Sequence, residues 1–204
     1  MKKFELTTES ITNVAGKKLF RIKALIDFED VKAGELGGYV EKEGNVSQDG
    51  NAWISDNAKV SGNAKVFGNA RISGDAWISD NAKVSGNARI SGNAWIFGNA
   101  EVFGDAEVSG DAWVFGNAKV FGDARISGDA DYTLIQGFGT EFRCTTFYRG
   151  KNKKIMVNCG CFHGDLEEFR KQVKETRSGK IAKEYLMIAD LMEYHFASED
   201  SSNE

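Results

Sequence analysis

The stretch ARISGNAWIFGNAEVFGD, residues 88–105, decides the fold of this chain. It holds three copies of a six-residue unit that reads alanine, a variable residue, an aliphatic residue, serine or phenylalanine, glycine, and asparagine or aspartate. Outward from this stretch the aliphatic position recurs every six residues from Ile54 to Ile126, with an alanine two positions before each. A repeat this regular indicates a solenoid, and a five-residue repeat is excluded because it would fall out of phase within two units.

The spacing inside the unit predicts which side chains face inward. Alanine and the aliphatic residue lie two positions apart, so an extended backbone points both to one side and points the neighbours of the aliphatic residue to the other. Glycine followed by asparagine or aspartate then falls at a corner, where these residue types adopt left-handed backbone angles most easily. Three corners close one coil of 18 residues, and residues 18 apart are predicted to stack. Proline is absent, as expected if nearly every backbone N–H donates a hydrogen bond.

Residues 54–131 resemble the hexapeptide-repeat superfamily of left-handed parallel β-helices, whose motif is an aliphatic residue followed four positions later by a small one. The resemblance implies a fold dominated by β-structure, with a left-handed sense to the coils. The expected β-helix spans residues 40–131, because Val40 and Val46 predict one irregular coil before the regular ones. Residues 1–39 are predicted to form an N-terminal cap, which covers the backbone groups that an open coil end exposes.

After Tyr132 the six-residue period ends, and a small α+β module is predicted over residues 132–197. Two strands, Phe142–Arg149 and Lys154–Phe162, are expected to form a hairpin. A helix capped by Asp165 with Glu168 follows, and then a second helix at about Ile181–Phe196. Residues 198–204 are predicted to be a disordered acidic tail. Residues 27–40 resemble the entry region of bacterial and phage hexapeptide-repeat proteins often described as polymer-forming. The ββαα module resembles C-terminal modules of phage-encoded proteins, mainly through residues 159–169.

The outward side chains sort into three faces, because every coil repeats the same three sides. The second face is aromatic, with Trp77, Trp95, Phe97, Trp113 and Phe115, and the third face adds Phe103 and Phe121. An exposed apolar patch of this size exceeds what soluble monomers usually show. We therefore predict that these residues form an interface in a homo-oligomer, most simply a trimer. Burial beneath the C-terminal module and contact with a foreign partner are the alternatives.

The first face is polar and carries a column of arginines, Arg71, Arg89 and Arg125, beside a ladder of serines. These arginines are candidate anion-binding residues. The alternative is a ladder of surface ion pairs, because Glu107 lies between Arg89 and Arg125, and Glu101 lies between two lysines on the third face.

Relatives in the superfamily include acyltransferases that use a coil histidine as general base, usually with a loop extruded from the coils. Here the two histidines, His163 and His195, lie outside the repeats, and no loop interrupts the repeats. We therefore expect no catalytic residues and no cofactor. No metal site is expected either. Cys159, Cys161 and His163 alternate along a predicted strand near Cys144, but zinc ligands usually come from turns with longer spacing, so buried structural thiols are predicted.

Charge and composition narrow the classes of partner that the chain is expected to bind. The formal net charge is −4 and no region is strongly basic, so nucleic acid is not an expected partner. Three cysteines, and the absence of a secretory or membrane-spanning segment in the sequence, lead us to expect a cytoplasmic protein without a membrane partner.

Together these features favour a non-enzymatic, oligomeric binding or scaffold protein. The resemblance implies a phage or prophage origin, with binding of a host protein or a small signalling molecule as a counter-defence. The alternative is an atypical acyltransferase with its site at a subunit interface.

Overall fold

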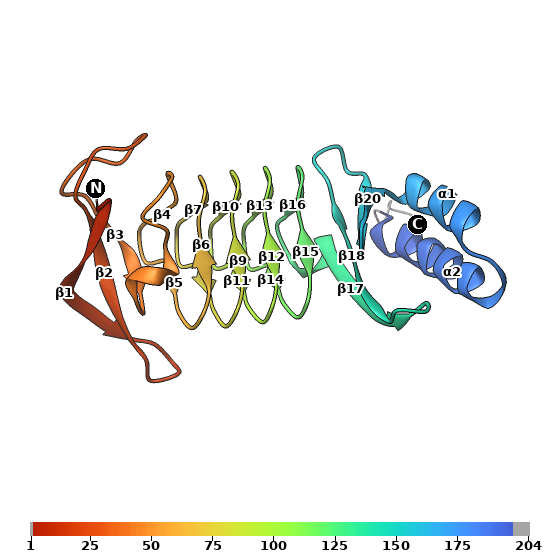
Figure 1. The fold of residues 1–204 in the computed structure, drawn as a ribbon, viewed down its shortest axis with the longest axis horizontal. Helices are drawn as coiled ribbons and strands as arrows, with labels where there is room; N and C mark the ends of the chain where they lie inside the picture. Colours follow the sequence, from red (N-terminus) through yellow and green to blue (C-terminus); the bar gives the residue numbers. More distant parts are fainter. Residues whose placement is uncertain (1, 198–204) are drawn as a thin grey trace, which may run out of the picture. The chain divides into compact units, whose positions relative to one another are not determined.

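A computed structural model describes residues 2–197 of the 204-residue chain. The chain divides into two compact units, Met1–Asp129 and Ala130–Glu204. Figure 1 labels most of the helices and strands of both units. The predicted acidic tail, residues 198–204, lies outside the described residues.

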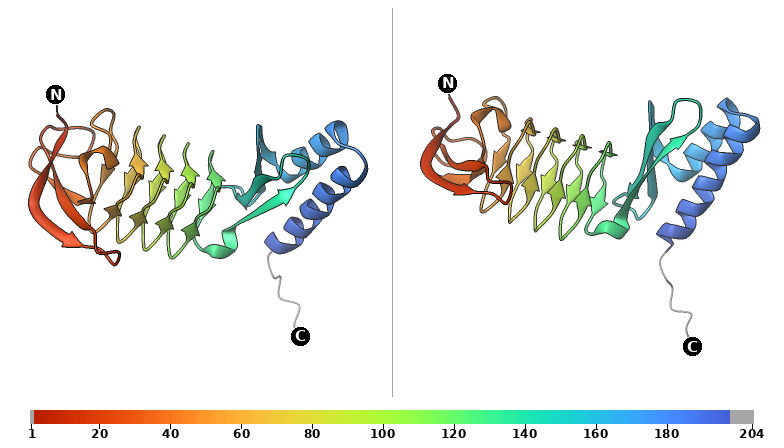
Figure 2. Two further views of the ribbon diagram at one scale, coloured as in Figure 1. Left: turned by 60° about the horizontal axis from the view of Figure 1, so that its bottom comes forward. Right: turned by 90° about the horizontal axis from the view of Figure 1, so that it is seen from below.

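The first unit is built around a parallel β-solenoid, visible as stacked coils in Figures 1 and 2. Each strand is two residues long and holds the variable and the aliphatic residue of one repeat. The strands are β4 (Trp53–Ile54), β5 (Lys59–Val60), β6 (Lys65–Val66), β7 (Arg71–Ile72), β8 (Trp77–Ile78), β9 (Lys83–Val84), β10 (Arg89–Ile90), β11 (Trp95–Ile96), β12 (Glu101–Val102), β13 (Glu107–Val108), β14 (Trp113–Val114), β15 (Lys119–Val120) and β16 (Arg125–Ile126).

The short strands form three parallel sheets, one for each face of the coil. The first face has the order β16-β13-β10-β7-β4, the second face contains β5-β8-β11-β14, and the third has the order β15-β12-β9-β6. Paired residues stand one coil apart, as Trp95 opposite Trp113 and Glu101 opposite Lys119 show. The 18-residue coil and its stacking are thereby confirmed, and the left-handed sense stays a prediction.

Small and branched side chains fill the interior of the coils, as the repeat predicts. Every alanine of the repeat from Ala52 to Ala124 and every aliphatic residue of the series from Ile54 to Ile126 is at most 1% exposed. Successive coils are joined by backbone hydrogen bonds, such as the 2.9 Å bond from the N–H of Arg89 to the carbonyl of Ala106. An interior packed this closely accepts no longer side chain without displacing a coil.

The corners explain why glycine recurs. Gly86 has a φ of +68°, and a β-carbon there would lie 2.7 Å from the backbone nitrogen of Gly104 on the next coil. Glycine is therefore needed for the left-handed angle and also for the close approach of the two backbones. Asp80 stands at an equivalent corner with a φ of 56°, and its carboxylate accepts a 3.0 Å hydrogen bond from the N–H of Gly98.

Asparagines beside the corners form a ladder along the coils. Asn63 donates to Asn81, Asn81 to Asn99 and Asn99 to Asn117, over distances of 3.2, 3.1 and 3.1 Å between amide nitrogen and amide oxygen. Each side-chain bond joins neighbouring coils, so the ladder reinforces the backbone bonds that set the stacking.

The N-terminal segment extends the sheet of the second face. Strands β1 (Phe4–Thr12), β2 (Lys18–Ala24) and β3 (Leu36–Val40) give it the order β1-β2-β3-β5-β8-β11-β14. Strand β3 is parallel to β5, with Val40 opposite Val60. After the short 3₁₀ turn η1 (Glu43–Asn45), Val46 bridges Val66. The irregular coil that Val40 and Val46 predict is thus confirmed.

Lys3 closes the open end of the coils. Lys3 is 2% exposed, and its ammonium group donates hydrogen bonds to the carbonyls of Gly50 at 3.1 Å and Ala52 at 2.8 Å. Burial, with a smaller effect from the positive charge of Arg71, lowers the pKa of Lys3 to about 8. The lysine satisfies carbonyls that have no preceding coil to bind them.

The second unit is a four-stranded antiparallel sheet with two helices (Figure 2). After the 3₁₀ turn η2 (Asp129–Asp131) come β17 (Tyr132–Phe138), β18 (Arg143–Arg149), β19 (Ile155–Cys159), β20 (Phe162–Asp165), α1 (Leu166–Thr176) and α2 (Gly179–Phe196). The predicted ββαα order is therefore wrong, and the order is ββββαα. Gly160, with a φ of 62°, turns the chain and divides the expected second strand, while residues 132–138 pair with β18.

The helices cover an apolar side of this sheet. Phe147 and Val157 from the strands pack with Phe169 of α1 and with Ala189 and Phe196 of α2, all at most 3% exposed. The predicted cap of the first helix is confirmed, because the carboxylate of Asp165 accepts from the N–H of Glu168 and the Glu168 carboxylate accepts from the N–H of Asp165.

Candidate functional site

A column of tryptophans runs up the second face of the coils. Trp77, Trp95 and Trp113 stand on β8, β11 and β14 in register. The ring centroids of Trp77 and Trp95 are 5.1 Å apart at an interplanar angle of 71°, and those of Trp95 and Trp113 are 5.1 Å apart at 5°. The first indole is also fixed by a hydrogen bond, since Trp77 Nε1 donates to the Ser61 hydroxyl at 3.1 Å.

Two phenylalanines complete this surface. Phe97 and Phe115 stack with 5.4 Å between centroids, and Phe97 meets the ring of Trp113 edge-on at 6.1 Å. We call the five residues Trp77, Trp95, Phe97, Trp113 and Phe115 the aromatic strip. The sequence-predicted second-face residues therefore lie together on one continuous surface.

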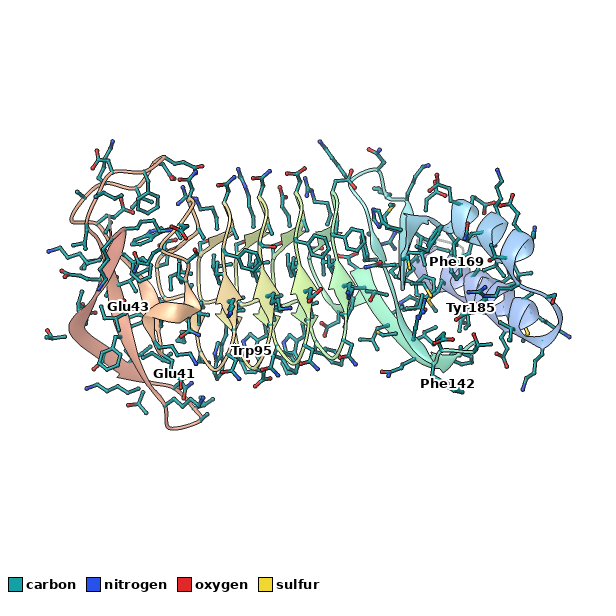
Figure 3. All side chains as sticks on the ribbon, viewed as in Figure 1. Glu41, Glu43, Trp95, Phe142, Phe169 and Tyr185 are labelled. Carbon is teal, nitrogen blue, oxygen red and sulfur yellow. The ribbon has the colours of Figure 1, made fainter. Side chains whose placement is uncertain are left out.

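The aromatic strip is open to solvent in the chain. Trp95, Trp113 and Phe115 are 36, 45 and 42% exposed, and Trp77 and Phe97 are half-buried. Figure 3 shows Trp95 on the outer side of the coils. The outward direction follows from the two-residue strands, because the aliphatic neighbour of each tryptophan points into the interior.

The third face carries a smaller aromatic contact. Phe103 and Phe121, which we call the phenylalanine pair, stack with 4.7 Å between centroids and are half-buried. Beside them Glu101 forms ion pairs with Lys83 at 3.0 Å and with Lys119 at 3.5 Å. The Lys83 hydrogen bond is the main cause that lowers the pKa of Glu101. The ion-pair ladder predicted for this face is confirmed.

Two of the three arginines on the first face form ion pairs within the described residues. Arg71 is held by the carboxylates of Glu29 and Asp30, and Arg125 pairs with Glu107 at 3.3 Å. Arg89 is exposed and makes no ion pair within the described residues. The predicted ladder is therefore wrong for the Arg89 to Glu107 step. An anion site at Arg71, Arg89 and Arg125 stays a prediction.

A tryptophan at the start of the first face is covered by the cap. Trp53 is 3% exposed, and its ring meets Phe28 at 5.5 Å and Phe4 at 6.3 Å. It points outward from the coils as Trp95 does. The repeat alone gives no signal that separates the two, since the covering residues come from the non-repetitive N-terminal segment.

The cysteines and histidines do not share a strand. Cys159 ends β19, Cys161 lies in the turn, and β20 returns antiparallel so that His163 pairs with Asn158. The predicted alternation along one strand is therefore wrong. Burial is the main cause that raises the pKa of the half-buried Cys144, whereas Cys161 is exposed and does not fit the prediction of buried thiols. Within residues 2–197 no group of three histidine, cysteine or acidic residues is placed to hold a metal ion.

Comparison with known proteins finds a family model that matches within the repeats. A family model described as the YdcK Beta solenoid repeat matches residues 82–98. This match agrees with the 18-residue stacking of the coils. The chain is a hexapeptide-repeat-like β-solenoid. No curated protein matches it. Among residues 2–197, no helix has the length and apolar character needed to cross a membrane.

Proposed function

We propose that this β-solenoid is a non-enzymatic scaffold that assembles into a homotrimer through the aromatic strip and the phenylalanine pair. The exposed aromatic strip carries the proposal. Buried aromatic side chains contribute about 150–250 Å² each to an interface, so covering this surface yields a large gain from the hydrophobic effect.

The spacing of the aromatic strip favours another copy of the same chain as its occupant. The rings recur once per coil, at 5.1 Å between the centroids of Trp95 and Trp113. A second solenoid of the same repeat presents rows at the same spacing, so its side chains can interdigitate with this surface over several coils. An unrelated globular partner has no such periodic row.

The presence of aromatic surfaces on two different faces supports a ring over a two-fold dimer. The aromatic strip lies on the second face, and Phe103 and Phe121 lie on the third. A two-fold dimer uses one self-complementary patch, whereas a closed ring gives each copy two different patches. The trimer is the smallest such ring.

Light scattering coupled to size-exclusion chromatography tests this proposal. The wild-type protein should have three times the 22.4 kDa mass of the chain. The W95S/W113S variant should be monomeric with an unchanged far-UV circular dichroism spectrum. R89S, a change at an exposed position of the first face on the same coil as Trp95, should remain trimeric. A monomeric wild type contradicts the assembly, and a stable dimer contradicts the ring.

A further inference from the structure

The second unit contains a cavity of about 150 Å³. Its lining includes Phe162 of β20, Phe169 and Val173 of α1 and Tyr185 of α2. Figure 3 labels Phe169 and Tyr185. A space of roughly 150 Å³ is large enough for a single benzene-sized ring.

The walls are aromatic and arranged at angles to one another. The ring of Phe169 lies 5.5 Å from that of Phe162 at 55° and 5.9 Å from that of Tyr185 at 90°. Phe169 is 3% exposed, so the half-buried rings of Phe162 and Tyr185 present the accessible aromatic surface. Aromatic groups prefer offset-stacked or edge-to-face contacts with such rings. The interior of the cavity therefore suits an aromatic group better than a flexible alkyl chain.

Two guanidinium groups stand at the same cavity. Arg143 and Arg177 both line it, both are exposed, and neither forms an ion pair with a described residue. Arg143 lies against the turn, because a β-carbon at Gly160 would be 2.5 Å from its Nη1 atom. Glu141 is the acidic residue of the lining, so the rim keeps an excess of positive charge.

Tyr185 lines the cavity together with both arginines. Burial is the main cause that raises the pKa of Tyr185, Cys159 adds to this effect, and the positive charges of Arg177 and Arg143 oppose it. The hydroxyl group approaches the carbonyl of Phe138 at 3.4 Å. This contact engages the single O–H donor of the phenol, so the two guanidinium groups are the donors that the rim offers to a ligand.

We propose that this cavity binds a small carboxylate that carries one aromatic ring, with the ring against Phe162 and Tyr185 and the carboxylate against Arg143 and Arg177. The guanidinium group suits this role because its fork of N–H donors matches the two oxygens of a carboxylate. The apolar walls supply the affinity for the ring, and the arginines select acids over neutral aromatic compounds.

Isothermal titration calorimetry with phenylacetate tests the site. Phenylacetate should bind saturably with one site per chain, and benzyl alcohol should bind at least roughly tenfold more weakly because it cannot form charge-assisted hydrogen bonds. The R143Q/R177Q variant should lose roughly tenfold or more in affinity. K171Q/K174Q removes two exposed positive charges of α1 outside the cavity lining and should bind as the wild type does.

Cysteine protection provides a second measurement. Cys161 is exposed and lines the cavity, so saturating phenylacetate should slow its alkylation by iodoacetamide in the wild type but not in R143Q/R177Q. Circular dichroism reports whether R143Q/R177Q is folded. The proposal is overturned if no saturable binding occurs up to about 10 mM, a weak limit for a ligand of this size. Equal binding by wild type and R143Q/R177Q also overturns it.

Discussion

The indole rings of Trp95 and Trp113 lie one coil apart with 5.1 Å between their centroids and an angle of 5° between their planes. Both rings are more than a third exposed. Parallel stacking of identical side chains at the spacing of the backbone produces a flat apolar row, which only a similarly spaced surface covers well. This pair is the centre of the proposed interface.

The assembly should make thermal stability depend on protein concentration. A ligand or partner that binds only the folded state raises the melting temperature by mass action, and a second subunit acts in the same way. We expect the melting temperature of the wild type to rise with concentration, and that of W95S/W113S to stay constant. Differential scanning fluorimetry over a hundredfold concentration range measures this. A wild-type melting temperature that does not change with protein concentration would argue against subunits held together by the aromatic strip.

Replacing Ala88 with leucine should strongly destabilise the protein. Ala88 is fully buried inside the coil, and overpacking of a filled interior costs about 1–3 kcal/mol or more. Urea denaturation gives the free energy of unfolding. Arg89→Leu, an outward change at the next residue, is the control and should have little effect on this free energy. A melting temperature of A88L within about 2 °C of the wild type would show that the assigned inward position is wrong.

The corner glycines should not tolerate a β-carbon. At Gly86 the left-handed backbone angle and the backbone of Gly104 both oppose it, so Gly86→Ala should lower the free energy of unfolding by about 1–3 kcal/mol. Gly44 lies in the 3₁₀ turn η1 with open space around the position of a β-carbon and is the control. Gly44→Ala should change stability by less than about 1 kcal/mol. Equal stability of the two variants would contradict the role of the corner.

Lys3 should make stability depend on pH. The pKa of Lys3 is about 8 in the folded protein, against an ordinary value of 10.5, so between these pH values the unfolded chain binds one more proton. The contribution of Lys3 to the free energy of unfolding should therefore rise as the pH increases from 8 to 10.5. Below pH 8 the amine is charged in both states and this contribution is smallest.

Urea denaturation of wild type and Lys3→Met at pH 7.5 and pH 10 measures this difference. K3M also leaves the carbonyls of Gly50 and Ala52 without their donor, which should cost about 1–3 kcal/mol at either pH. Lys2→Met, at an exposed position, is the control. It removes an ion pair with Glu43, and its difference in stability from wild type should be the same at both pH values. A wild-type to K3M difference that shrinks toward pH 10 would refute the assignment.

The proposed non-enzymatic role predicts that no acyl-CoA is turned over. His163 lies on β20 and His195 on α2, so neither belongs to the coils, where hexapeptide-repeat acyltransferases carry their general base. Free CoA, measured with a thiol reagent in the presence of amine or sugar acceptors, should not accumulate above the rate without protein. Turnover that disappears in H163A or H195A would replace the scaffold proposal with the acyltransferase alternative.

The sequence determined the coils because their contacts repeat. Once an alanine and an aliphatic residue recur every six positions, each residue stacks on the one a coil away, so the column of Trp77, Trp95 and Trp113 follows without any further fold information. The inward alanines, the corner glycines and the ion pairs of Glu101 follow for the same reason. In a solenoid, long-range neighbours are fixed by a local period.

Tertiary structure decided the parts that have no period. Trp53 and Trp95 occupy equivalent positions of the repeat, yet only Trp53 is buried, because Phe28 from the cap meets it. The cavity beside Phe169 likewise brings together side chains from strands and helices that no spacing relates. Such contacts depend on which surfaces meet after folding, and in these segments the sequence determines local turns and caps but not the neighbours across the core.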